Sequence, residues 1–274
     1  MEGSSQGRST TSGLRRTAAG ARGCGTLRTV PTPRLHLTAA LAAGSTLSLP
    51  GAAARHVQVL RLQPGDALTL FDGRGGEWRA RVGSIGRTEV VVEVIAHHAI
   101  ERELSCEVTL VLGMPANDRM DLLVEKASEL GAAALQPLVT SRSVLRPAAD
   151  RAERRRAHWQ AVAAAACEQC GRNRVPAVAP VRALRDWLRD LPEPDPGEAR
   201  VLLGFAADAH TLPKTAGSAR RVWLLSGPEG GLTVEEEGDA RARGFVPVTL
   251  GARVLRADTA PLAALAWLAL REAA

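Results

Sequence analysis

The sequence predicts an α/β protein in which a small N-terminal β domain precedes a larger region built on a mainly parallel sheet. From Pro33 to about His98, short β-prone runs alternate with glycine-rich turns, and beyond Leu104 strand-like and helix-like segments alternate. A chain of 274 residues suits two domains of unequal size. We therefore expect a basic tail over 1–32, a β domain over 33–98 and an α/β domain over 99–274.

The first 32 residues are rich in Gly, Ser, Thr and Arg and lack apolar periodicity, so they are predicted to be disordered. No apolar segment of the kind found in a secretory signal follows them. A misassigned start codon would explain the segment equally well.

The N-terminal domain is predicted to hold strands at Ala67–Asp72, Glu77–Val82 and Glu89–Ile95. A spacing of about ten residues between strands is typical of a small barrel. The segment Asp72–Gly76 reads DGRGG and is expected to be a hairpin loop. Because a strand rather than a helix follows it, its glycines favour positive φ and not phosphate binding.

The larger domain should alternate strands with helices and end in an apolar helix. The expected strands are Val108–Gly113, Ala134–Val139, Val201–Phe205, Val222–Ser226 and Val246–Gly251, and the expected helices are Asp118–Leu130, Arg151–Cys170 and Thr259–Arg271.

Composition narrows the class of protein without deciding it. Apolar residues make up 45% and charged residues 23%, and no segment approaches the roughly 20 apolar residues that span a bilayer, so an integral membrane protein is not expected. A net charge of +6 favours a polyanionic partner such as nucleic acid. The alternative is genomic bias, since nearly all basic residues are arginine and tyrosine is absent.

Four cysteines, Cys24, Cys106, Cys167 and Cys170, are too few for a disulfide scaffold and favour a reducing cytoplasm. Cys167 and Cys170 form a C-x-x-C pair, but the second pair that a zinc site needs is missing, so no metal is expected. A redox role is also disfavoured, because the pair lies late in a predicted helix.

A glycine-rich turn, Gly227–Gly231, follows the predicted strand Val222–Ser226 and precedes a helix with a capping box formed by Thr233 and Glu236. Such a strand, turn and helix form a concave site at the carboxyl edge of a sheet. The turn matches neither G-x-G-x-x-G nor the P-loop, which disfavours a nucleoside triphosphate. A simple tight connection would explain the pattern about as well.

A second loop, Leu250–Ala260, reads LGARVLRADTA and lies just before the final helix. With the GPEGG turn at the expected separation, it resembles the RsmE family, the 16S ribosomal RNA uridine-N3 methyltransferases of the SPOUT superfamily. The resemblance runs from Pro33 onward and includes His56–Arg61, Lys126–Gly131 and Glu168–Pro176. Two departures are Ala252, where the family usually has proline, and Ala257-Asp258, where Thr-Glu is common.

The resemblance implies a SPOUT-type C-terminal domain with a deep trefoil knot, an N-terminal PUA-like β-barrel and S-adenosylmethionine (SAM) as the cofactor. Base rates oppose a knot, so only the resemblance supports one. Glycines would let the backbone approach adenine and ribose, and leucines would supply apolar walls. The implied cofactor-binding residues are Leu203, Gly204, Ser226, Gly227, Pro228, Glu229, Gly230, Gly231, Leu250, Gly251, Val254, Leu255, Arg256 and Ala257.

Arg256 is the candidate that stabilises the uracil anion, because a guanidinium beside the ring favours negative charge on the oxygens that flank N3. Glu229 or Asp258 would accept the proton or hold the arginine. A structural salt bridge between Arg256 and Asp258 is the alternative.

Small-subunit 16S rRNA is the expected partner, and the candidate contacts to it are Arg34, His56, Arg61, Arg142 and Arg172. The face carrying Arg151, Arg154, Arg155 and Arg156 would add to them or be an ordinary solvated helix face.

A homodimer is expected because SPOUT relatives pair near the knot and Pro261–Arg271 is almost wholly apolar. Burial of this helix within its own subunit would give the same pattern.

Two other function classes fit less well. An inactive rRNA clamp is disfavoured by the intact turn, and an α/β hydrolase is disfavoured because Ser226 lacks the G-x-S-x-G elbow.

Overall fold

The computed structural model describes residues 32–271, apart from the side chains of Asn117 and Asp118. The predicted tail lies outside these residues except for Thr32. The described chain holds two sheets, one of five strands and one of eight, which agrees with the predicted α/β protein with a β-rich N-terminal part. Within residues 32–271, no helix is both long and apolar enough to cross a bilayer.

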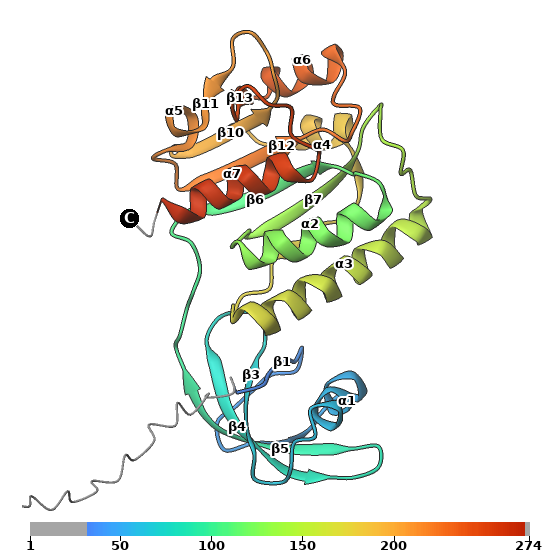
Figure 1. The fold of residues 1–274 in the computed structure, drawn as a ribbon, viewed down its shortest axis with the longest axis vertical. Helices are drawn as coiled ribbons and strands as arrows, with labels where there is room; N and C mark the ends of the chain where they lie inside the picture. The colour runs from blue at the N-terminus through green and yellow to red at the C-terminus, as the bar shows by residue number, and fades with distance from the viewer. Residues whose placement is uncertain (1–31, 272–274) are drawn as a thin grey trace, which may run out of the picture. The chain divides into compact units, whose positions relative to one another are not determined.

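The N-terminal sheet has the strand order β1-β3-β4-β5-β2 (Figure 1). Its strands are β1 (Arg34–His36), β2 (Thr46–Ser48), β3 (Ala67–Phe71), β4 (Glu77–Ile85) and β5 (Val90–His98), and one helix, α1 (Gly51–Val59), joins β2 to β3. The strands predicted at 67–72, 77–82 and 89–95 are confirmed, whereas β1, β2 and α1 were missed because each is short. Alternating apolar side chains from these strands, with Ala54 and Val57 of α1, form the core of this sheet.

The predicted hairpin loop between β3 and β4 is confirmed. Gly73, Gly75 and Gly76 have φ values of 80°, 115° and 70°, which side chains with a Cβ rarely adopt.

The second sheet has the order β11-β13-β10-β12-β6-β7-β8, with β9 also paired to β7, and every pairing in it is parallel. Its strands are β6 (Glu107–Gly113), β7 (Ala134–Val139), β8 (Ala177–Val178), β9 (Arg182–Ala183), β10 (Glu198–Leu203), β11 (His210–Thr211), β12 (Arg221–Ser226) and β13 (Val246–Thr249). The predicted parallel sheet is therefore confirmed, and all its strands end at one edge.

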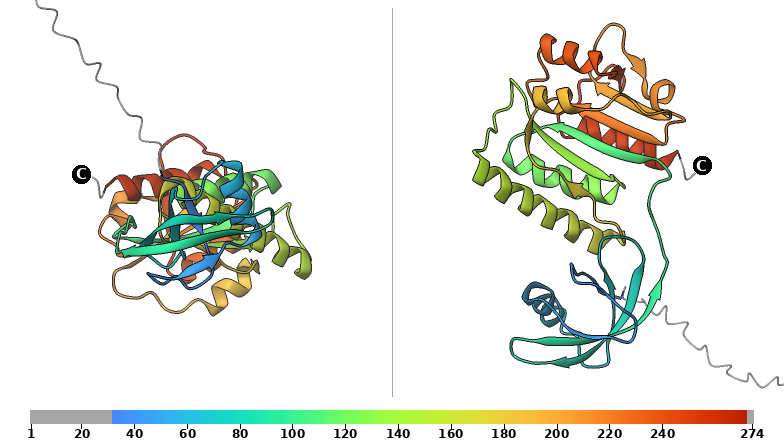
Figure 2. Two further views of the ribbon diagram at one scale, coloured as in Figure 1. Left: turned by 90° about the horizontal axis from the view of Figure 1, so that it is seen from below. Right: turned by 180° about the vertical axis from the view of Figure 1, so that it is seen from behind.

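Helices cover both faces of this sheet (Figures 1 and 2). The helices are α2 (Asn117–Glu129), α3 (Ala149–Cys170), α4 (Leu184–Asp190), α5 (Leu212–Ala216), α6 (Val234–Ala242) and α7 (Thr259–Leu270). Along β6, Val108, Leu110 and Leu112 join one apolar cluster with α2, α3, α5 and α7, whereas Val111 joins another with α4 and α6. A strand buried on both faces reads as a continuous apolar run, which is why β6 was easy to predict.

Candidate active site

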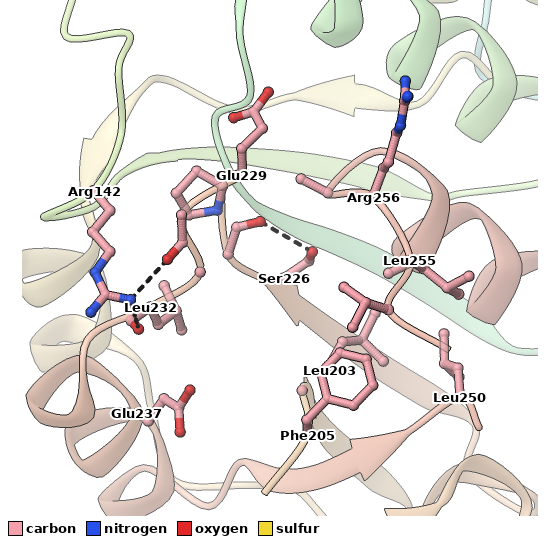
Figure 3. A pocket seen from close by; sticks show the side chains of 18 of the residues that line it. Arg142, Leu203, Phe205, Ser226, Glu229, Leu232, Glu237, Leu250, Leu255 and Arg256 are labelled. Carbon is pink, nitrogen blue, oxygen red and sulfur yellow. Dashed lines mark hydrogen bonds between the residues drawn. The ribbon is translucent and has the colours of Figure 1, made fainter. Parts of the chain in front are cut away.

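A pocket of about 730 Å³ lies at the carboxyl edge of the parallel sheet, and the loops that follow β10, β12 and β13 form much of its wall (Figure 3). Parallel strands bring these loops together because their carboxyl ends meet at the same edge. Three segments far apart in the sequence thus share one cavity of the size that holds a small-molecule ligand.

The pocket has an apolar end and a charged end. In Figure 3, Leu203, Phe205 and Leu250 gather at one end, and Glu229 and Arg256 lie at the other. Leu203 and Leu250 are half-buried, whereas the Phe205 side chain is 59% exposed. An apolar wall suits a flat, poorly hydrated group, and the charged end suits the reacting atoms.

The glycine-rich turn is held in place from both sides. Arg142 donates from Nη1 to the carbonyl oxygens of Gly230 and Leu232, at 2.8 and 3.1 Å. Gly231 has a φ of 69° and donates its N–H to the Pro228 carbonyl. A Cβ on Gly227 would lie 2.9 Å from the Gly231 backbone, so the turn closes tightly only with glycine there.

The predicted capping box of α6 is confirmed. The Thr233 hydroxyl accepts the Glu236 N–H, and the Glu236 carboxylate accepts the Thr233 N–H. The same carboxylate also accepts the N–H of Ser141 at 2.7 Å. Burial raises the pKa of Glu236, but the hydrogen bonds from Thr233 and Ser141 outweigh it and hold that pKa below its ordinary value.

At the charged end, Glu229 contacts the first turn of α2 and the residue just before this helix, and it does not contact Arg256. Its Oε1 accepts the Ala116 N–H at 3.1 Å and lies 3.9 Å from Nη1 of Arg119. Among residues 32–271, no ion pair joins Arg256 to Asp258, and Asp258 instead accepts a 3.3 Å hydrogen bond from the Thr259 hydroxyl. The alternative of a structural salt bridge between Arg256 and Asp258 is thus not found.

Thirteen of the implied cofactor-binding positions line this pocket; Gly251 and the candidate Asp258 do not. Gly251, with a φ of 111°, shapes the loop through a hydrogen bond with Thr249. The pocket residues that the motifs did not identify are Arg119, Phe205, Ala206, Leu232, Glu237, Val248, Arg253 and Ala260, together with Arg142, which was assigned to RNA. Arg119 and Glu237 lie on helices outside both motifs, and only the fold brings them here.

Known families match both parts of the chain. An RNA methyltransferase domain matches residues 102–269, and an RNA methyltransferase PUA domain matches residues 49–95. The ribosomal RNA small subunit methyltransferase E of a Synechocystis strain is 35% identical over 81% of this chain and 72% of its own length. That of Bacillus subtilis is 32% identical over 80% and 88%.

The chain belongs to the ribosomal RNA small subunit methyltransferase E family.

A solved member of this family, from Neisseria gonorrhoeae and bound to SAM, is 36% identical, with a TM-score of 0.81 over 86% of this chain and 96% of its own. A Legionella pneumophila methyltransferase in complex with SAM is 31% identical, with a TM-score of 0.80 over 89% and 98%. Both relatives therefore share the architecture of nearly all of the described chain.

Two arginines that the family motif suggested as rRNA contacts are engaged inside the protein. Arg172 is 4% exposed, forms a salt bridge to Glu103 and donates to the carbonyls of Ser128 and Ala132. Every nitrogen of this guanidinium already has a protein acceptor. This burial argues against the predicted RNA contact of Arg172, and charge in the sequence does not reveal it.

Arg34 also has partners inside the protein. It donates from Nη1 to Glu77 at 2.7 Å and from Nη2 to the Asn173 side-chain oxygen at 2.5 Å, and its guanidinium lies over the Phe71 ring. Its side chain is only 14% exposed. These internal partners argue against its predicted RNA contact as well.

The other family-matched RNA candidates stay accessible. The His56 side chain is 42% exposed, with Nδ1 3.9 Å from a Glu168 carboxylate oxygen, and Arg61 is exposed. Arg142 is exposed as well, although its guanidinium holds the glycine-rich turn.

Cys167 and Cys170 are free thiols, and Cys24 lies outside the described residues. Over residues 32–271, no cluster of three or more His, Cys, Asp or Glu side chains is placed to hold a metal ion.

Proposed function

We propose that this chain transfers a methyl group from SAM to N3 of a specific uridine in the 16S rRNA of the small ribosomal subunit. The observation that supports this best is the polarised pocket, in which the GPEGG turn and the Leu250–Ala257 loop meet as the family's motifs require. The Synechocystis, Bacillus subtilis and Neisseria gonorrhoeae relatives are small-subunit rRNA methyltransferases, and the two solved neighbours hold SAM.

The pocket residues fit SAM. A Cβ added at Gly204 would meet nothing within 4 Å, so backbone at this wall is open to close approach by a ligand. The half-buried side chains of Leu203, Leu250 and Leu255 offer an apolar surface for the adenine ring. When bound, SAM supplies an electrophilic methyl group on a sulfonium leaving group.

We assign the stabilisation of the uracil anion to Arg256. It lines the charged end of the pocket, its side chain is exposed, and none of the carboxylates that the structure describes forms an ion pair with it. A guanidinium that no acid neutralises keeps its full charge for the base. Glu229 acts by holding a neighbouring arginine, and Asp258, which lies outside the lining, supports the loop.

For the finer architecture we propose a deep trefoil knot within 99–274 and a PUA-like barrel within 33–98. The placement of β10 between β12 and β13, with all three following loops at one pocket, is compatible with a knot. The barrel rests on the five-stranded order and on the PUA match.

We also propose a homodimer that uses α7. Pro261, Ala264, Leu265 and Leu268 of α7 are buried, but Leu262, Ala266 and Trp267 are only half-buried and Leu270 is 70% exposed. A second copy would cover this remaining apolar side. Exposed His56, Arg61 and Arg142 are the proposed rRNA contacts, and the cytoplasm, where ribosomes are assembled, is the proposed location.

Incubation with radiolabelled SAM and small subunits that lack the modification tests the function. We expect one methyl group per 16S rRNA, and nuclease digestion with mass spectrometry should identify 3-methyluridine. Label on another base or in another RNA would refute the assignment, and sedimentation of the active enzyme at the 28.9 kDa monomer mass would refute the dimer.

A further inference from the structure

Arg119 lies at the charged end of the pocket, although neither sequence motif contains it. It belongs to the first turn of α2, which starts just after β6 at the same carboxyl edge as the cofactor loops. We propose that Arg119, held by Glu229, contacts one carbonyl oxygen of the target uracil while Arg256 contacts the other. This proposal rests on the proposed function and names a second residue that acts on the same base.

Glu229 is the carboxylate that lies beside Arg119. One oxygen of that carboxylate accepts the Ala116 N–H at 3.1 Å and lies 3.9 Å from Nη1 of Arg119. The carboxylate is thus tied to the backbone just before α2, and it attracts the arginine from a fixed point. Figure 3 shows Glu229 at the same end of the pocket as Arg256. Two arginines from different elements, α2 and the loop after β13, therefore line that end.

The Arg119 guanidinium keeps donors for a ligand. Its side chain is 33% exposed, and the guanidinium makes no hydrogen bond to any side chain or carbonyl that the structure describes. Its one ion pair, at 3.9 Å, is longer than a hydrogen bond. A guanidinium carries five N–H donors, so most of them can face a substrate. By contrast, every nitrogen of the Arg172 guanidinium has a protein acceptor.

The chemistry at N3 calls for two cations. Uracil N3 lies between the carbonyl oxygens O2 and O4, and the negative charge that develops when N3 loses its proton is shared by both. One arginine in the ring plane reaches only one of these oxygens. In the transfer, N3 gives its proton to solvent and bonds to the methyl carbon, while the carbon–sulfur bond breaks and its electron pair stays on sulfur. Fixed positive charge on both sides stabilises the anion more than charge on one side.

The test compares the wild type with Arg119→Ala, Arg119→Lys, Glu229→Gln and, as a matched control, Lys214→Ala. Lys214 is an exposed cation on α5 outside the pocket. Turnover on unmodified small subunits is measured from pH 6 to pH 9.5, and calorimetry gives the Kd for SAM.

We expect Arg119→Ala to lower kcat at neutral pH by about a hundredfold, as for the loss of one oxyanion donor. Without the cation, the pKa of the bound uracil rises, so the rate rises with pH over a higher range and the deficit narrows in alkali. Arg119→Lys should recover part of kcat, and SAM affinity should change less than about twofold. Lys214→Ala should match the wild type.

The dependence on Glu229 is read from a double variant. If Glu229 acts through Arg119, Glu229→Gln should lower kcat in the wild type but not further in the Arg119→Ala background. Full additivity would overturn the positioning role of Glu229. A loss of SAM affinity with unchanged kcat, or an unshifted pH profile, would overturn the role of Arg119. Failure of the wild type to methylate uridine N3 would instead refute the proposed function.

Discussion

The two loops that meet across the pocket differ in how firmly the protein holds them. The turn Ser226–Gly231 is fixed by Arg142, by Ala116 through Glu229 and by the capping box that follows it. The loop Leu250–Asp258 has mainly local hydrogen bonds, and Val254 at its centre is 82% exposed. One wall is therefore held by several distant contacts, whereas the other depends mainly on contacts within its own loop.

The largest effect on SAM affinity should come from adding a side chain to the firmly held turn Ser226–Gly231. A Cβ on Gly230 would lie 3.1 Å from the Arg142 Cβ, so Gly230→Val forces the turn and its clamp apart. We expect the Kd for SAM to rise by about a hundredfold, or ~3 kcal/mol, measured by calorimetry. Gly238→Val is the matched control, because a Cβ at Gly238 in α6 meets nothing within 4 Å. Equal affinity of the Gly230 variant and the wild type would show that the turn is not the cofactor site.

Removing only the Arg142 side chain, which holds the turn, should lower SAM affinity less than Gly230→Val. Arg142→Ala leaves the turn in place but frees the carbonyls of Gly230 and Leu232. We predict about a tenfold loss of SAM affinity, since a hydrogen bond from a charged donor contributes roughly 1.5–3 kcal/mol. Arg146→Ala is the control, because Arg146 donates to Thr140, Ser141 and Ser143 but not to the turn. A similar loss in both variants would assign the effect to the whole loop.

A substitution in the loop Leu250–Asp258 should weaken the binding of RNA more than the binding of the cofactor. Arg253 is exposed on it, and we expect Arg253→Gln to change the Kd for SAM less than about threefold. Binding to 16S rRNA should weaken. The logarithm of the association constant should also depend less steeply on the logarithm of the salt concentration, by the amount expected for the loss of about one phosphate contact. Equal salt slopes for the variant and the wild type would argue against RNA at this wall.

The smallest effect concerns the cap of α6. Thr233→Ala should lower the free energy of unfolding by about 1 kcal/mol. The lowered pKa of Glu236 means that its share of this stability is complete above its ordinary value of 4.5 and is lost as the pH falls through the lowered pKa. Urea unfolding of the wild type and Glu236→Gln should therefore differ at pH 7 and converge in acid. A constant difference across this range would contradict the role of the carboxylate.

The sequence predicted the parts of the site that are set by local chemistry. The strand Val222–Ser226, the glycine turn and the Thr233 cap depend on neighbouring residues, and the pattern of residue types specifies them. Short elements such as β8, β9 and α5 were not predicted, because two to five residues show no clear hydrophobic periodicity.

The surroundings of other residues could not be predicted, for a different reason. Arg34 and Arg172 match the family motif, yet whether an arginine meets RNA or a buried carboxylate depends on residues up to 139 positions away. Arg119 was missed for the converse reason. Nothing near it in the sequence indicates that Glu229 lies beside it, because β6 and β12 must first pair before α2 and the turn share an edge.

That pairing also bears on synthesis. Glu107–Leu112 of β6 pairs with Arg221–Ser226 of β12, so an apolar central strand leaves the ribosome long before its neighbour is made. All strands of the N-terminal sheet, by contrast, are complete by His98 and can pair at once. Parallel pairings between segments that are distant in the sequence form slowly, and the intermediates expose apolar surface and are prone to aggregate. Until β12 is made, β6 can pair on one side with β7 and pack against α2, while its other edge stays open.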